Sequence, residues 1–337
     1  MNCFVKVICG LLLLFATSAY AVEFNDGSRA RDALAKQVRM MFEKKKFAEL
    51  DAMAEKFRKS KSRFPDGAWK LDVFYTGFDL STSTPEWAFP QWIAFANEWR
   101  RARPTSVTAQ CVLTGAWMDY AWQARGGGYA SQVKEESWKL AKDRLDKAWK
   151  IVNEPLASGV KDCPNRLNLR LRLATAMGFE KKQFDMLFQE AQRQEPGYYS
   201  HYITKGNYLL SKWHGEEGDW QQFIDKVVVQ NPRGEGLTIY TRTAWRLFSG
   251  NNWKDFRGSG VSWDRMKAGF KQIDHNYPKS PWILNAYARF ACRAGDRDTL
   301  ISLFKRIDYD HYYPEAWDKD DVNFCRKWAG LQPFAGK

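Results

Sequence analysis

Apolar side chains recur at steps of three and four residues along most of this chain, which is the spacing of an amphipathic helix. The segment 131–152 carries one such stripe, made of Trp138, Ala141, Leu145, Ala148 and Val152. The segment 105–126 carries another, made of Ala109, Val112, Ala116 and Tyr120. Only the glycine-rich RGGGYA (125–130) separates the two segments, so the pattern predicts a helix–turn–helix unit.

Similar pairs of stripes follow towards the C-terminus. The predicted helices are 198–213 with 219–229, and 280–295 with 296–307. The run LNLRLRL (167–173) alternates like a strand, but Leu167, Leu171 and Ala174 also share a helical face. Because its neighbours are helical, we expect a helix there.

Two sequence-distant turns resemble each other. FEKKKFAEL (42–50) and FEKKQFDML (179–187) agree at six of nine positions. Self-similarity among helix pairs is typical of an α-solenoid, in which stacking buries faces that one pair cannot cover alone. The sequence therefore predicts an all-α αα-superhelix, a solenoid of irregular tetratricopeptide-like hairpins. We expect one domain over 22–337, with a basic helical part over 27–104 and the repeat body over 105–337.

The first residues have the pattern of a secretory signal peptide. A basic Lys6 precedes the apolar run 8–15, and Ala19-Tyr20-Ala21 forms a small-x-small cleavage site. We therefore expect cleavage after Ala21 and a periplasmic or secreted protein. The apolar run is too short to span a bilayer of about 30 Å, and no later segment predicts a transmembrane helix.

Four cysteines follow this expected cleavage site: Cys111, Cys163, Cys292 and Cys325. An even number in an exported chain favours disulfides, although four buried free thiols remain an alternative. Successive hairpins place neighbouring helices side by side, so local pairing, 111–163 and 292–325, is our hypothesis. No spacing typical of a zinc site occurs.

The chain carries a formal charge of +13, and 13 of its Lys and Arg lie within 27–70 against 6 Asp and Glu. Such a balance favours anionic partners, although a solvated helix face is the simpler interpretation. We expect the partner to be a protein, a peptide or an anionic envelope polymer. Export argues against nucleic acid, and no motif predicts a cofactor.

The stretch KWHGEEGDWQQF (212–223) places a histidine beside three acids. Helix ends explain most of it: Gly215 fits a helix C-terminus, and Asp219 fits an N-cap with Gln222 three residues on. Only the side chain of His214 is left without a structural task. The weak binding candidates of the chain are Trp213, His214, Trp220 and Arg125.

Two further motifs predict no chemistry. RGGGYA lacks the Lys-Ser/Thr of a phosphate-binding loop and reads better as a helix stop. DYDHYYPEAWDKDD (308–321) gathers carboxylates and an imidazole, but it misses the calcium-loop spacing, so we expect an acidic connection. No metal ligand and no catalytic residue are assigned.

Four phrases occur in order along the chain: FAELDAMAEKFRKSKSRFPDGAWKLDVFY, RPTSVTAQCVLTGAWMDYAWQARGGGY, NYLLSKWHGEEGDWQQF, and NAYARFACRAGD followed by CRKWA. Together they resemble an uncharacterised bacterial family of exported helical-repeat proteins, defined only as a domain of unknown function. The resemblance implies an αα-superhelical fold and no known reaction.

Two functions are compatible with these patterns. The first is a binding or scaffold protein of the bacterial periplasm or exterior, because helical repeats present long surfaces without built-in chemistry. The alternative is an envelope hydrolase that acts on cell-wall glycan or peptide through paired carboxylates. A deep cleft with convergent acids would favour the enzyme, and a groove without them would favour binding.

Overall fold

The computed structural model describes residues 26–128, 130–231, 235–251, 256–307, 311–317 and 320–334. In this part of the chain the regular structure is helical, and an isolated bridge between Arg63 and Trp69 is the one β-type pairing. The all-α prediction is therefore confirmed. The predicted signal peptide lies outside the described residues.

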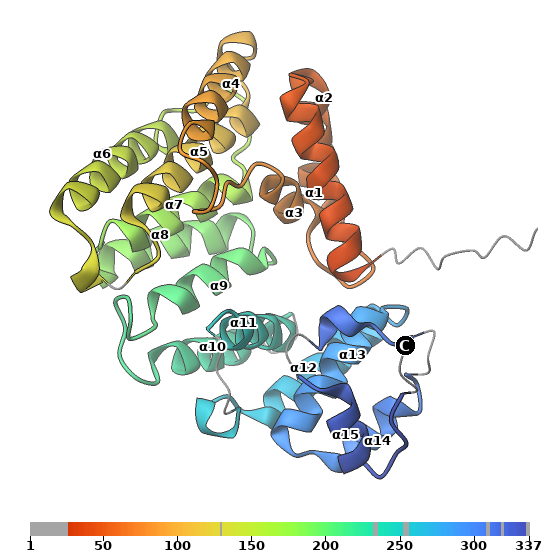
Figure 1. Cartoon of the computed structure of the whole chain (residues 1–337). Helices are drawn as coiled ribbons and strands as arrows, with labels where there is room; N and C mark the ends of the chain where they lie inside the picture. The colour runs from red at the N-terminus through yellow and green to blue at the C-terminus, as the bar shows by residue number, and fades with distance from the viewer. Residues whose placement is uncertain are drawn as a thin grey trace, which may run out of the picture.

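The helices follow one another along a curved path (Figure 1). They are α1 Gly27–Glu43, α2 Phe47–Ser60, α3 Lys70–Thr76, α4 Ala88–Ala102, α5 Val107–Arg125, α6 Glu135–Val152, α7 Pro164–Ala176, α8 Lys181–Gln194, α9 Tyr199–Tyr208, α10 Asp219–Gln230, α11 Gly236–Gly250, α12 Trp263–Asn276, α13 Pro281–Ala294, α14 Arg297–Phe304 and α15 Val322–Trp328. Short 3₁₀ turns occupy Ala130–Gln132, Arg257–Ser259 and Pro314–Ala316.

Helices α5, α7, α9 and α11 contact one another in that order and form an inner row. Their partners α6, α8, α10 and α12 pack beside them. This arrangement is consistent with an α-helical solenoid. It also explains the ambiguous run in α7: Leu167, Leu169, Leu171 and Leu173 are all buried, because an inner helix has neighbours on several sides.

Aromatic rings fill the space between helices. In the N-terminal part, the Phe42 ring lies 4.7 Å from that of Trp92 and 5.2 Å from that of Phe78, centroid to centroid, both edge-on. Near the C-terminus, Phe290 contacts Phe256 at 5.6 Å in the same way. Such edge-to-face pairs add to the stabilisation from burial, so these clusters hold successive helices at fixed angles.

The first helix packs against the C-terminal part of the chain. The Tyr313 hydroxyl donates a hydrogen bond to the Asp26 carbonyl over 3.2 Å, and the Ser280 hydroxyl donates to the Asp26 carboxylate. Gly27 has φ +65°, and a Cβ there would come within 2.8 Å of the Trp282 ring. A side chain at this position would therefore separate α1 from α13.

The loop 62–69 joins three regions at the centre of the molecule. The buried Asp66 pairs with Arg31 of α1, and its carbonyl accepts a hydrogen bond from Arg242 of α11 at 2.6 Å. The indole of Trp69 donates to the Gly197 carbonyl just before α9, at 2.8 Å. One loop thus ties α1, α9 and α11 together.

Cys292 of α13 and Cys325 of α15 form a disulfide, with their Cα atoms 5.9 Å apart. This pairing confirms the prediction for the C-terminal half. The bond fixes the short helix α15, which leaves Phe324 exposed on its outer side.

The turn between α9 and α10 differs from the prediction in two respects. Helix α9 ends at Tyr208 rather than at Trp213, and Gly218, not Gly215, takes the left-handed conformation, with φ +87°. Gly215 serves another purpose: a Cβ there would meet the Leu209 carbonyl oxygen at 2.1 Å, so glycine permits a tight reversal. The N-cap is Gly218, and Asp219 is the first residue of α10.

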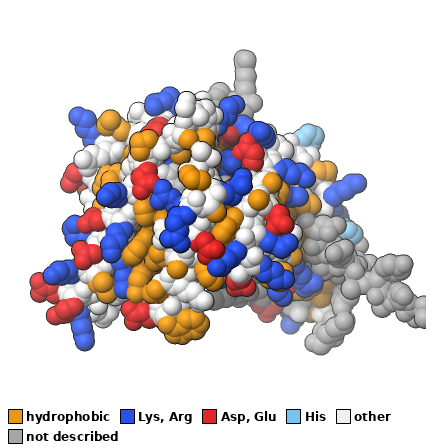
Figure 2. Space-filling view, turned by 90° about the horizontal axis from the view of Figure 1, so that it is seen from above, with side chains coloured by type: hydrophobic (Ala, Val, Ile, Leu, Met, Phe, Trp, Pro, Cys, Tyr) orange, Lys and Arg blue, Asp and Glu red, His pale blue; other side chains and the backbone are white. Residues whose placement is uncertain are grey.

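The positive charge is distributed rather than concentrated on the face seen in Figure 2. Lys and Arg side chains alternate there with Asp, Glu and hydrophobic side chains. No helix among the described residues combines the length and the apolar composition that crossing a bilayer requires.

Candidate functional site

A groove of about 600 Å³ runs along α2 beside the N-terminus of α5. We call it the α2–α5 groove. One wall is a stripe of α2 side chains at steps of three and four: Ala48, Asp51, Ala52, Glu55, Arg58 and Lys59. The other wall consists of residues 103, 105–108 and 159–161. The opposite face of α2 is buried through Phe47, Leu50 and Ala54. The groove stripe is therefore the polar face of an amphipathic helix.

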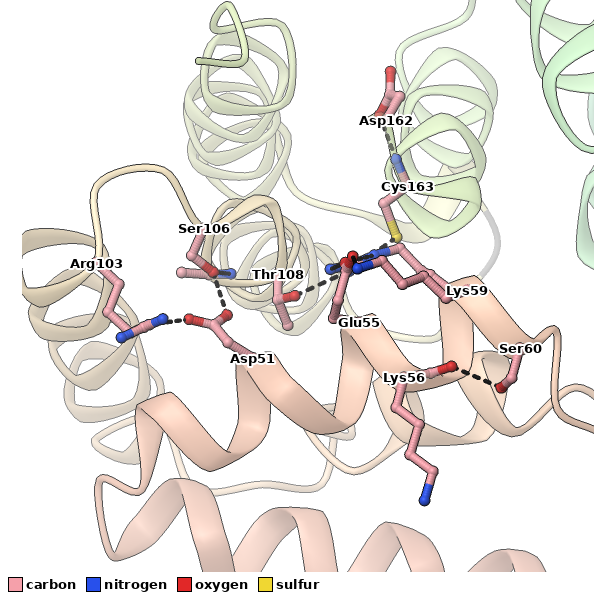
Figure 3. Close-up of polar contacts among 12 residues, drawn as sticks. Asp51, Glu55, Lys56, Lys59, Ser60, Arg103, Ser106, Thr108, Asp162 and Cys163 are labelled. Atoms are coloured by element: carbon pink, nitrogen blue, oxygen red, sulfur yellow. Dashed lines mark hydrogen bonds and ion pairs between the residues drawn. The ribbon is translucent and has the colours of Figure 1, made fainter. Parts of the chain in front are cut away.

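Asp51 connects the two walls (Figure 3). Its carboxylate pairs with Arg103 and accepts a hydrogen bond from the Ser106 hydroxyl. Ser106 is the N-cap of α5, where its side-chain oxygen also accepts from the Ala109 amide at 2.9 Å. The helix end is therefore held against α2 by one carboxylate, and the first turn of α5 faces the groove.

Arg58 forms the floor at the other end of the groove. Its guanidinium donates to Glu55 at 2.7 Å and to the Thr108 hydroxyl at 3.1 Å, and it lies 3.9 Å from the sulfur of Cys163. The pKa of Arg58 is raised, since the surrounding acceptors outweigh its burial. The guanidinium therefore stays charged while it links α2, α5 and the start of α7.

Cys163 and Cys111 lie together behind Arg58, but they do not form the predicted disulfide. Both are buried free thiols in contact. Burial raises the pKa of the Cys163 thiol, yet the hydrogen bond from Cys111, the charge of Arg58 and the Tyr75 hydroxyl at 3.4 Å lower it to about 6. The predicted neighbourhood is correct, but a contact between two free thiols takes the place of the bond.

Cations outnumber carboxylates in the α2–α5 groove. The lining holds Arg58, Lys59, Arg103 and Lys161 against Asp51 and Glu55. Lys59 pairs with Glu55 at 3.0 Å, whereas Lys161 forms no ion pair within the described parts of the chain. The groove therefore retains a positive balance, to which the N-terminal dipole of α5 adds.

The weak sequence candidates lie elsewhere. Arg125 ends α5, and its guanidinium lies 5.5 Å from the Trp122 ring centre and 5.0 Å from that of Trp138. Trp213 meets the same Trp122 edge-on at 5.9 Å. The structure thus brings Arg125 and Trp213 into one aromatic cluster. The two residues are far apart in the sequence, so residue spacing does not predict this contact.

His214 and Trp220 have structural tasks. The His214 ring stacks on Tyr208 at 4.7 Å, and its Nε2 hydrogen bonds to the Thr175 carbonyl at 2.9 Å. Trp220, in the first turn of α10, is buried. The histidine that the sequence left without a task therefore connects the α9–α10 turn to the end of α7.

The acidic stretch 308–321 is divided between separate contacts where it is described. Glu315 pairs with Arg29, and Asp320 pairs with both Arg289 and Arg293. Asp308, Asp310 and Asp318 lie outside the described residues. Nowhere in the described ranges do three or more His, Cys, Asp or Glu side chains gather as a metal ion would require.

In the described residues, fold and groove together define a helical protein with a basic groove. Residues 34–150 match the model of a family described as "Domain of unknown function (DUF4034)". The match contains the first two of the four phrases on which the resemblance was based and crosses the expected boundary at residue 104. No curated protein and no solved structure matches the chain.

The groove residues were missed by the sequence reasoning. Asp51, Arg58 and Lys59 stood within a basic segment interpreted as a solvated face, and Lys161 lay in an unremarked loop. The available signal was the polar stripe at helical spacing beside the apolar stripe of α2. What the sequence did not supply was the distance between α2 and α5, which depends on tertiary packing.

Proposed function

We propose that the protein is an exported binding protein whose α2–α5 groove holds an acidic peptide segment of a partner protein. The observation that carries this proposal is the groove itself, which is long, open and lined by more cations than carboxylates. Its walls come from helix faces, so the bound segment would meet a preformed surface.

The lining suits a peptide chain better than a uniformly charged polymer. Small apolar side chains, Ala48 and Ala52, lie in the N-terminal half of the α2 wall and allow a backbone to approach closely. Thr105, at the rim, adds a hydroxyl that can serve a peptide group as donor or acceptor. Lys59 and Lys161 at the C-terminal end of the groove then supply the contacts for acidic side chains.

Charge reversal on the groove wall tests this proposal. We expect Lys59→Glu combined with Lys161→Glu to weaken binding of a fluorescein-labelled peptide rich in Asp and Glu. A hydrogen bond to a charged group contributes about 1.5–3 kcal/mol, so the loss should be about tenfold or more. Fluorescence anisotropy with the purified full-length protein measures it.

Lys56 provides a control on the same helix, with half the charge change of the double variant. Its side chain points away from the groove in Figure 3, so Lys56→Glu changes the net charge without touching the site. It should bind as the wild type does. An equal loss of affinity in Lys56→Glu and in the double variant would show long-range attraction instead of groove binding. If the wild type bound a Gln/Asn-rich peptide as tightly as the acidic peptide, that result would also contradict the proposal.

Export is a separate part of the proposal, supported by the signal-peptide pattern and by the Cys292–Cys325 disulfide. N-terminal sequencing of protein recovered from the periplasm or medium should begin at Val22. Recovery of the full-length chain only from the cytosol would contradict it.

A further inference from the structure

A second, smaller cavity of about 70 Å³ lies between α3, α5 and α7. Tyr75 and Cys111 line it, so it lies on the far side of the thiol pair from the α2–α5 groove. At about 10–15 Å³ for each enclosed water, its volume corresponds to about five to seven water-sized groups. That is the size of a very small metabolite.

Each side of the cavity offers one kind of polar group. Helix α7 presents Asn165, Asn168 and Arg172 on successive turns, and these can donate hydrogen bonds. Helix α3 presents Asp72 and the turn after it presents Asp79. A row of donors thus faces a row of acceptors.

These opposite charges do not neutralise each other directly. In the part of the chain that the structure describes, Arg172 forms no ion pair within 4.0 Å, although its charge lowers the pKa of nearby Asp119. One oxygen of Asp72 accepts hydrogen bonds from Tyr198 at 2.9 Å and Ser200 at 2.8 Å, while the other has no described partner. Both rows therefore keep unused hydrogen-bonding capacity that points to a ligand.

Gly115 keeps the cavity open. It lies inside α5, where glycine is less favourable than alanine, and its φ is not in the left-handed region. A Cβ at this position would meet no atom within 4 Å, so close packing does not require glycine. The space that a side chain would occupy belongs to the cavity.

We propose that this cavity binds a small free α-amino acid as a zwitterion, with its carboxylate at Arg172 and Asn168 and its ammonium group at Asp72 and Asp79. The floor, formed by Val112 and Leu169, leaves room for a side chain no larger than that of alanine or serine. The site is separate from the peptide groove, because the two share no lining residue.

Isothermal titration calorimetry of the full-length protein with glycine, L-alanine and L-serine tests the proposal. We expect saturable binding of at least one of them, and none of acetate, methylamine or L-phenylalanine. Binding of acetate or methylamine with equal affinity would show a site for a single charge and would overturn the proposal. Binding of diglycine in preference to all three amino acids would assign the site to a peptide terminus and would also overturn it.

Two substitutions at Gly115 distinguish an effect on the cavity from an effect on folding. Gly115→Ala should keep binding and raise thermal stability, whereas Gly115→Leu should fill the space and abolish binding with a native circular dichroism spectrum. Arg172→Gln should weaken amino-acid binding about tenfold or more, as expected for loss of a charged hydrogen bond. Unchanged affinity in both Gly115→Leu and Arg172→Gln would refute the assignment.

Discussion

The sulfur of Cys163 lies 3.9 Å from the Nη1 atom of Arg58, so a buried thiol and a half-buried guanidinium meet behind the α2–α5 groove. Cys163 is also the N-cap of α7, where the helix dipole favours negative charge. The sequence places these two residues 105 positions apart, and only the packing of α2 against α5 and α7 brings them together.

The first prediction concerns the charge of that thiol. Arg58→Gln removes the cation and should move the pKa of Cys163 from about 6 towards the ordinary thiol value of about 8.5. The ultraviolet absorbance of the thiolate, followed against pH, measures the shift, and Cys163→Ser identifies the signal. An unchanged midpoint in Arg58→Gln would show that Tyr75 and Cys111 suffice.

The second prediction concerns the disulfide. The Cys292–Cys325 bond closes a loop of 33 residues, so its removal should lower the free energy of unfolding by about 3–4 kcal/mol. Chemical denaturation of Cys325→Ser against the wild type measures this change. Non-reducing peptide mapping should recover this one linkage and should find Cys111 and Cys163 alkylated after unfolding; a recovered 111–163 linkage would contradict the structure.

The third prediction tests the central loop. Asp66→Ala leaves the half-buried Arg31 guanidinium without its carboxylate partner, at a position where desolvation lowers the Arg31 pKa to about 10. Loss of this partner should reduce the free energy of unfolding by about 1–3 kcal/mol. Asp66→Ala with Arg31→Met removes both partners and should recover part of the loss. A double variant less stable than the single one would argue against the pair.

The fourth prediction is a pH dependence at Asp119. Burial and then the charge of Asp79 raise the pKa of Asp119 to about 7, while Arg172, the Leu80 amide and Arg39 oppose the shift. The folded state therefore keeps a proton that the unfolded chain releases near pH 4. The contribution of protonated Asp119 to the free energy of unfolding is therefore fully present below about pH 4. It declines as the pH rises and is lost above about pH 7.

Asp119→Asn removes this dependence. The variant should be more stable than the wild type at pH 8, by a few kcal/mol, because one pKa unit corresponds to about 1.4 kcal/mol. At pH 4 the two proteins should differ little. Urea denaturation at pH 4 and pH 8 measures the free energy of unfolding of both proteins. If the variant and the wild type differed by the same amount at both pH values, Asp119 would not be the titrating group.

Local periodicity predicted the helices and the C-terminal disulfide, because both depend on neighbours within a few dozen residues. Local periodicity predicted less where the chain reverses direction. Glycine is needed at position 215 because a side chain would collide with the Leu209 carbonyl, and not because the backbone there is left-handed. Such a contact cannot be derived from local sequence. The candidate site was not predictable for the same reason. The contacts of Asp51 with Ser106, and of Arg58 with Thr108, join residues about fifty positions apart.

The contact of α1 with α13 has a consequence for how the protein unfolds. A linear row of helix pairs interacts only between neighbours and can fray from either end. Here Asp26 and Gly27 are seated against Ser280, Trp282 and Tyr313, so α1 cannot detach without exposing α13 near the opposite end of the chain. The array therefore has no independent first unit, and the unfolding of α1 is coupled to that of α13.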